Sequence, residues 1–173
     1  VEGTGTHASC YVPRGGAAGS SGRVFVAESK NFPTRKITPV GTNWVVTTIA
    51  GQYGIPGTVD GIGTAARFGG SFYGGPFAIA VDGAGSVYVA DSYSFTIRKI
   101  TPVGANWIVS TIGGMAGSLL SVDGAGDTAR FAFPEGVVVA RAGTVFVADS
   151  AKNTISTGVF PQSTASSPVP YTL

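Results

Sequence analysis

The stretch Val87-Tyr-Val-Ala-Asp91 is the middle one of three closely similar copies in the chain. The other two are Val24-Phe-Val-Ala-Glu28 and Val145-Phe-Val-Ala-Asp149, so the motif returns after 63 and then 58 residues. A fixed period of more than about twenty residues indicates a repeat architecture, in which each repeat is one supersecondary unit stacked against the next. The fold therefore has to be inferred from the repeat as a whole.

The sequence around this motif repeats as well. Arg35–Trp44 returns as Arg98–Trp107, and Val59–Phe68 returns as Val122–Phe131. We call the second pair of segments the inserts, because they lengthen the repeat beyond the ~40–45 residues of a simple propeller blade. The repeats are placed at about 1–58, 59–121 and 122–158, and a polar tail or linker rich in Pro, Ser and Thr follows at 159–173.

Composition favours an all-β protein with many turns. The 173 residues include 27 glycines and only 12% charged residues, and the chain has few of the residues that favour helices. A net charge of +2 does not support nucleic-acid binding. No apolar run approaches the roughly 20 residues that span a bilayer, so membrane insertion is not expected. The start, Val1-Glu-Gly-Thr4, does not resemble a signal peptide.

Within the middle repeat, turn residues separate four strand-like runs, at 77–81, 87–90, 95–100 and 107–112. The first two runs are apolar almost throughout, which indicates that both of their faces are covered. The third carries Arg98 and Lys99 and is expected to lie further out. Four antiparallel strands with buried inner ones describe a blade of a β-propeller.

The copies at the two ends are incomplete. Val1–Gly5 matches Val59–Gly63, and the first innermost strand, near 14–18, lacks the apolar residues of its counterpart. In the third copy Ser156 replaces Arg98, and no Trp-containing strand follows. We therefore expect about two complete blades plus partial ones, an incomplete propeller. Uncovered blade faces and strand edges favour association, so the predicted partner is the chain itself, in a homo-oligomer or a larger assembly.

Strand direction predicts which loops share a face. In an up-and-down blade the second and fourth strands end on the same side, so the acids that end the second strand should lie beside the inserts. We predict that Asp60 and Asp123 lie on loops at the face of Asp91, while Phe68 and Phe131 are buried and anchor the inserts.

One family resemblance rests on these residues. Phe77–Ser92, followed by Thr96–Ile100, resembles the NHL repeat of β-propeller proteins. The inserts look like those of the long-repeat variety in large secreted or surface bacterial proteins, and the resemblance covers about residues 1–158. It implies a propeller and an extracellular or cell-surface location, but little about chemistry. The chain departs from the family at Tyr93-Ser94, where Asn-His or Asn-Arg is common.

The recurring acids have two interpretations. As ligands they would hold a divalent cation such as Ca²⁺, which prefers oxygen donors; the candidates are Asp60, Asp91, Asp123 and Asp149. As structural residues they would accept hydrogen bonds from backbone amides at turns. We favour the structural interpretation and expect no required metal or other cofactor.

Other repeated side chains extend the candidate set. Arg67 and Arg130 are suited to binding an anion, although pairing with a nearby Asp is the favoured interpretation. Trp44 and Trp107 are suited to stacking on a glycan, although packing between blades is the default for such aromatics. The candidate interaction face consists of Asp60, Arg67, Asp91, Tyr93, Asp123, Arg130 and Asp149.

Two function classes follow. The first is a non-catalytic extracellular scaffold for interaction or self-assembly. The alternative is a propeller enzyme, lactonase-like or lyase-like, with a central divalent metal. His7 is the only histidine, no Gly-x-Ser-x-Gly nucleophile motif occurs, and the innermost strands carry acids only at their ends. We therefore favour the non-catalytic scaffold.

Overall fold

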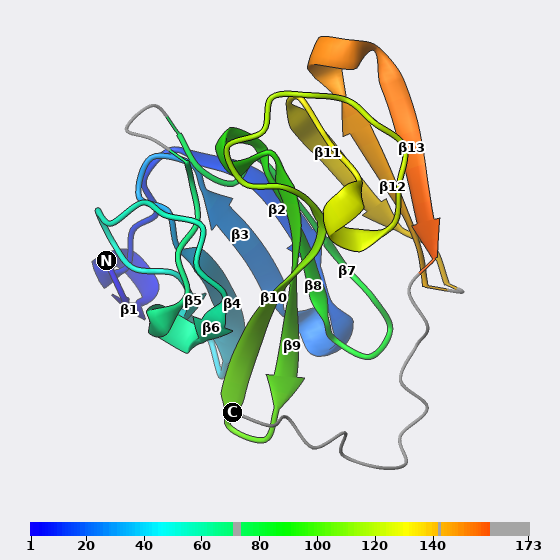
Figure 1. Cartoon of the computed structure of the whole chain (residues 1–173). Helices are drawn as coiled ribbons and strands as arrows, with labels where there is room; N and C mark the ends of the chain where they lie inside the picture. The colour runs from blue at the N-terminus through cyan, green and yellow to red at the C-terminus, as the bar shows by residue number, and fades with distance from the viewer. Residues whose placement is uncertain (71–73, 142, 160–173) are drawn as a thin grey trace.

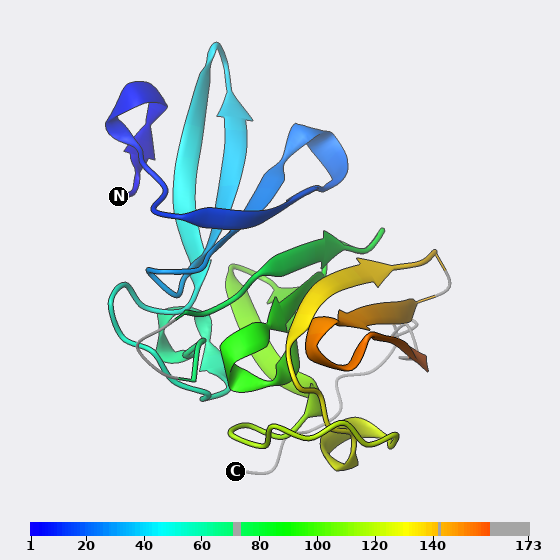
Figure 2. The same cartoon turned by 90° about the horizontal axis from the view of Figure 1, so that it is seen from above.

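Three antiparallel sheets follow one another along the chain in the computed structural model (Figure 1). The structure describes residues 1–70, 74–141 and 143–159. The predicted tail beyond Val159 therefore lies outside the described residues. Figure 2 shows the sheets as successive layers, from blue and cyan through green to yellow and orange. We call them blades 1, 2 and 3.

Blades 1 and 2 have the same plan, four blade strands and one short strand from the insert. The order in blade 1 is β1-β5-β4-β3-β2, and in blade 2 it is β6-β10-β9-β8-β7. The strands of blade 1 are β1 (Gly3–Thr4), β2 (Pro13–Ala18), β3 (Val24–Glu28), β4 (Thr34–Val40) and β5 (Asn43–Ala50). Those of blade 2 are β6 (Gly61–Ile62), β7 (Ala78–Val81), β8 (Val87–Asp91), β9 (Thr96–Val103) and β10 (Asn106–Gly114).

Blade 3 has three strands among the described residues, in the order β11-β12-β13. They are β11 (Pro134–Val139), β12 (Thr144–Asp149) and β13 (Thr154–Val159). Short 3₁₀ turns connect the elements: η1 (Gly5–His7), η2 (Ser20–Gly22), η3 (Gly63–Ala65), η4 (Ser92–Ser94), η5 (Gly126–Thr128) and η6 (Ser150–Lys152). The all-β propeller prediction, with two complete blades and a partial one, is therefore confirmed.

The turns form where the sequence places turn residues. Asp82 Oδ1 accepts hydrogen bonds from the N–H groups of Ala84 (3.0 Å) and Ser86 (2.8 Å), closing the β7–β8 hairpin. The outer hairpins use two-residue turns that begin with Gly41 and Gly104, whose φ angles of 60° and 59° favour glycine. These turn residues thus set the register of the hairpins they close in blades 1 and 2.

Blade 2 lies between two hydrophobic cores because the two sides of β8 face different neighbours. Val87 and Val89 pack with Phe25 of blade 1, and Tyr88 and Ala90 pack with Val145 of blade 3. All five residues of β8 are buried. Its continuous apolar sequence is therefore the result of contacts on both faces, as predicted.

Strand β2 forms although its sequence lacks the apolar residues of its counterparts. A Cβ atom on Gly15 would meet the carbonyl oxygen of Phe77 at 2.6 Å and the Cα of Ala78 at 2.8 Å. The small residues of β2 therefore permit a close approach of β7. The loss of apolar residues at 14–18 reflects this packing and does not interrupt the strand.

Candidate functional site

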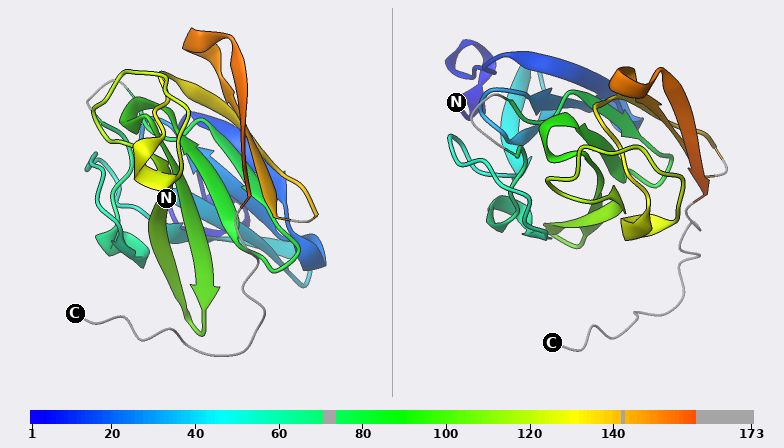
Figure 3. Two further views of the ribbon diagram at one scale, coloured as in Figure 1. Left: turned by 45° about the vertical axis from the view of Figure 1, so that its right-hand side comes forward. Right: turned by 45° about the horizontal axis from the view of Figure 1, so that its top comes forward.

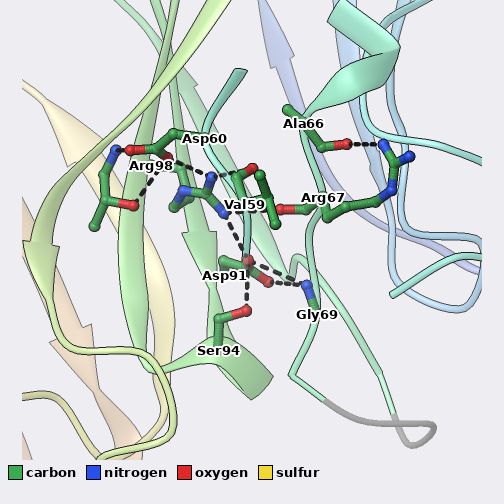
Figure 4. Close-up of polar contacts among 9 residues, drawn as sticks. Val59, Asp60, Ala66, Arg67, Gly69, Asp91, Ser94 and Arg98 are labelled. Carbon is green, nitrogen blue, oxygen red and sulfur yellow. Dashed lines mark hydrogen bonds and ion pairs between the residues drawn. The ribbon is translucent and has the colours of Figure 1, made fainter. Parts of the chain in front are cut away.

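The most polar buried site lies at the end of β8, where blade 2 meets its insert (Figure 4). The side chain of Asp91 is fully buried. Its Oδ1 accepts a hydrogen bond from the Gly69 N–H at 2.9 Å, and its Oδ2 accepts one from the Ser94 hydroxyl at 2.7 Å. One donor lies in the adjacent turn η4 and the other in the segment after the insert, so the structural role of Asp91 extends further than the sequence suggested.

Arg98 joins Asp91 to the insert. Its Nη1 lies 3.5 Å from Asp91 Oδ2, and its Nη2 lies 2.6 Å from Asp60 Oδ1. The guanidinium also donates hydrogen bonds to the carbonyl oxygens of Arg67 (2.9 Å) and Val59 (3.0 Å). The prediction that Asp60 lies on the face of Asp91 is therefore confirmed.

Strand β9 is the third strand of blade 2, counted from the innermost strand β7, as expected. The side chain of Arg98 is nevertheless fully buried. Alternate residues of a strand point to opposite faces, and Arg98 points to the face between blades 1 and 2. There it stacks over the ring of Phe68, 5.0 Å from the ring centroid. Phe68 is fully buried and Phe131 is 8% exposed, so the prediction that both are buried is confirmed.

Burial changes the acidity of this site. Desolvation raises the pKa of Asp91 to about 6, although Arg98, Ser94 and the Gly69 amide each lower it. A buried carboxylate that titrates near neutral pH makes blade stability dependent on pH.

Blade 1 contains a related set of residues. Arg35 Nε lies 3.6 Å from Glu28 Oε1, and the amide of Asn31 donates a hydrogen bond to Glu28 Oε2 at 2.9 Å. Glu2, the counterpart of Asp60, accepts the N–H of Thr48 at 2.6 Å. In both complete blades a buried arginine pairs with the strand-end acid, and the insert acid accepts a backbone N–H of the outermost strand. In blade 2 the arginine also forms an ion pair with the insert acid.

Blade 3 keeps both acids and lacks the arginine. Asp149 Oδ2 accepts the N–H of Ala132 (2.7 Å), and its Oδ1 accepts the N–H of Phe133 (2.8 Å). Ser156 stands at the position of Arg98. Asp123 lies on the loop before η5, and no described residue donates a hydrogen bond to it or forms an ion pair with it.

No carboxylate of the described residues pairs with Arg67 or Arg130, contrary to the expectation. Arg67 Nη1 donates hydrogen bonds to the carbonyl oxygens of Thr64 (2.5 Å) and Ala66 (2.7 Å). Arg130 Nη1 makes the equivalent hydrogen bonds to the carbonyl oxygens of Asp127 and Ala129. Both arginines therefore satisfy the backbone of their own 3₁₀ turn, a role that sequence alone does not reveal.

The candidate aromatic residues have different environments. Tyr93 is half-buried, and its ring centroid lies 5.9 Å from those of Phe77 and Phe133. Trp107 packs edge-on against Phe25 of blade 1 at 5.9 Å, as expected for packing between blades. Its counterpart Trp44 is 47% exposed.

Within the described ranges, no cluster of three or more His, Cys, Asp or Glu side chains has the arrangement of a metal site. The same part of the chain contains no helix that is long and apolar enough to cross a membrane. The structure brings Asp60 and Asp91 together through Arg98. In blade 3, Asp149 binds backbone amides and Asp123 lies on the loop before η5.

Neither Arg98 nor its counterpart Arg35 is among the candidate site residues from the sequence. Both arginines could have been identified from the repeated Arg-Lys-Ile segment, which follows a repeated acid in each of the first two repeats. One residue of each Arg-Lys pair must face a neighbouring blade, because strand side chains alternate between faces.

Comparison with known proteins supports the fold. No protein-family model matches the chain, and no curated protein matches it. A Bacteroides thetaiotaomicron protein of unknown function is 22% identical, with a TM-score of 0.66 over 79% of this chain and 32% of that one. An auxiliary nutrient binding protein from the same organism is 23% identical, with a TM-score of 0.66 over 82% of this chain and 36% of that one.

Virginiamycin B lyase from Staphylococcus aureus is also similar in structure. It is 15% identical, with a TM-score of 0.51 over 94% of this chain and 45% of that one. The chain thus spans between a third and a half of the structures it matches. The architecture is that of a β-propeller segment. The neighbours include both a binding protein and an enzyme, and likenesses of this kind establish the fold alone.

Proposed function

We propose that the chain is a non-catalytic binding and assembly module of the NHL-repeat type that acts outside the cell. The sequence resemblance supports the NHL type and the extracellular location. The observation that carries the assembly function is the exposure, at both ends of the blade stack, of aromatic side chains whose counterparts pack against each other at an internal junction.

The internal junctions show what normally covers these surfaces. At the junction of blades 1 and 2, Trp107 packs on Phe25, and Val87 and Val89 complete the contact. At the next junction, Tyr88 and Ala90 take the positions of Phe25 and Ala27 and pack against blade 3. The same repeat positions therefore form both junctions.

The outer face of blade 3 presents these positions to solvent. Phe146 corresponds to Phe25 and Tyr88 and is 39% exposed. Val138 is 62% exposed and Ile155 is 74% exposed on the same face. At the other end, Trp44 corresponds to Trp107 and is 47% exposed on the outer face of blade 1.

The two end faces correspond to the two sides of an internal junction between blades. A second copy docked head to tail would place its Trp44 on Phe146, as Trp107 lies on Phe25. Full burial of each large apolar side chain contributes about 1.5–3 kcal/mol. A head-to-tail contact produces a ring if the rotation closes and an open filament if it does not.

The polar site favours a structural role over metal catalysis. Asp91 is held by Arg98, Ser94 and Gly69, and Asp149 is held by two backbone amides. We expect thermal unfolding to be the same in EDTA and in CaCl₂. A midpoint that falls in EDTA and recovers with calcium would instead favour the metal-dependent function.

The assembly function is tested by the mass of the native chain against concentration, measured by sedimentation or light scattering. We expect masses above that of the 17.4-kDa chain at micromolar concentration, with association that persists in high salt because the contact is apolar. A compact monomer at all concentrations would contradict the proposal.

A further inference from the structure

In both complete blades the insert pairs with the outermost strand; in blade 1 the segment Val1–Gly5 takes the place of the insert. Gly3 pairs with Val46 of β5, and Gly61 pairs with Val109 of β10. The insert acid then accepts the N–H of a threonine on that strand: Thr48 donates to Glu2 (2.6 Å), and Thr111 donates to Asp60 (2.9 Å). The insert is therefore one wall of a site for an extended strand.

Blade 3 has this insert, but its described residues include no fourth strand. A cavity of about 800 Å³ lies between the insert and β13. The insert contributes Asp123 and Gly124 to its lining, β13 contributes Ser156, and Phe131 and Val147 form part of its apolar lining. Figure 3 shows the course of the chain through this insert, in yellow, and through β13, in orange. Strand β13 is the edge of its sheet, so one side of its backbone is available for pairing.

Blade 3 also lacks the arginine that lies at the equivalent place in blades 1 and 2. Ser156 leaves the space that Arg98 fills in blade 2, and Asp123, which lines the groove, has no cationic partner among the described residues. In blade 2 the residue paired with Arg98 is Thr111. A residue in that position of an added strand would lie opposite Ser156, with its Cβ about 4.5–5.5 Å away.

We propose that the groove binds an extended segment of another polypeptide as the fourth strand of blade 3, with an arginine or lysine opposite Ser156. This inference deepens the proposed binding function and rests on it. Main-chain pairing with β13 and the insert supplies affinity, as in other cases of strand addition. The basic side chain supplies specificity by replacing the missing arginine beside Asp123.

The chain's own segment 160–173 does not have this chemistry. It contains Pro161, Pro168 and Pro170 and no Lys or Arg. Gln162 stands where Gly104 forms the two-residue turn of blade 2. The chemistry of the groove therefore favours a strand from another chain.

The test uses two labelled peptides and the full chain. One peptide has the sequence of residues 106–114, and the other carries the Thr111→Arg change. Fluorescence anisotropy gives the dissociation constant of each. We expect saturable binding of the arginine peptide, about tenfold tighter than that of the threonine peptide, as for one added charge-assisted contact.

Three substitutions test where the peptide binds. Asp123→Asn should weaken binding of the arginine peptide about tenfold. Asp127→Asn, in the same insert, changes an exposed acid outside the cavity lining and should leave binding unchanged. Ser156→Arg restores the internal cation and should abolish the preference for the arginine peptide.

Absence of saturable binding, or equal effects of Asp123→Asn and Asp127→Asn, would overturn the proposal. Its failure is distinct from failure of head-to-tail assembly. If the chain associates without binding either peptide, the assembly proposal stands and the groove proposal fails. If the chain is a monomer and binds the arginine peptide, the groove proposal stands and the assembly proposal fails.

Discussion

Arg98 and Asp91 form a fully buried ion pair between blades 1 and 2. Breaking such a pair costs more than the pair itself contributes, because it leaves one charge buried without a partner. Asp60 is about half exposed, so its contact with Arg98 is partly screened by water and contributes less.

Replacing Arg98 by alanine should reduce the free energy of unfolding by about 3–5 kcal/mol, because Asp91 loses its counter-charge. Chemical denaturation measures this change. Arg141→Ala, at an exposed position, is the matched control and should change it by less than about 0.5 kcal/mol. Adding Asp91→Asn to Arg98→Ala should recover part of the loss; equal stability of the single and double variants would contradict this account.

Stability should also depend on pH through Asp91. Its pKa of about 6 in the fold lies above the ordinary value of 3.8, so the folded chain holds this proton more tightly than the unfolded chain. The resulting stabilisation is full below the unfolded pKa and is lost as the pH rises through about 6. We expect the free energy of unfolding to fall by about 1 kcal/mol between pH 5 and pH 7.

The Asp91→Asn variant isolates this effect, because it removes the titrating group and leaves the others in place. The measurement stays at pH 5 and above, since the hydrogen bond from Thr48 lowers the pKa of Glu2, which acts only at lower pH. The same fall in stability in the native chain and in the variant would assign the pH dependence to another group.

At the scale of the element, the neighbouring blade limits the size of the side chains that a strand can carry. The close approach of β2 and β7 requires small residues, and Gly15 lies against the backbone of Phe77 and Ala78. Side-chain size at one strand thus sets the distance between two blades.

The Gly15→Ala substitution should therefore destabilise the fold by about 1–3 kcal/mol through overpacking. Gly83→Ala is a matched control, because a Cβ atom there has no neighbour within 4 Å and its φ is not in the left-handed region. Thermal and chemical denaturation of both variants check the prediction. Equal losses would show that glycine flexibility, and not the contact with β7, explains the effect.

The repeat predicted the strands, the hairpins and the buried anchors Phe68 and Phe131, because these depend on local periodicity and recurring turns. It did not predict the burial of Arg98, since a strand covered on both faces has no polar side from which to assign orientation. The contacts of Arg67 were also missed, because backbone carbonyl acceptors carry no sequence signal. The sequence showed that blade 3 has Ser156 in place of Arg98. Only the structure of blade 2 showed that this replacement removes the cation beside the insert acid.

At the scale of the whole molecule, the proposed head-to-tail contact joins the outer face of blade 3 to the outer face of blade 1. Phe146 and Trp44 are the residues that the internal junctions place at the centre of this contact. Because the two faces differ, blocking one face of each copy should permit a single contact and no more.

The most direct test mixes two variants, Phe146→Asp and Trp44→Asp, after circular dichroism has shown that each is folded. Each variant alone should be a monomer of about the 17.4-kDa chain mass, because it has lost one of the two faces. Sedimentation of the equimolar mixture should show a one-to-one dimer, since each variant supplies the face that the other lacks. A mixture that stays monomeric while the native chain associates, or a native chain that is itself a monomer, would contradict the head-to-tail assembly.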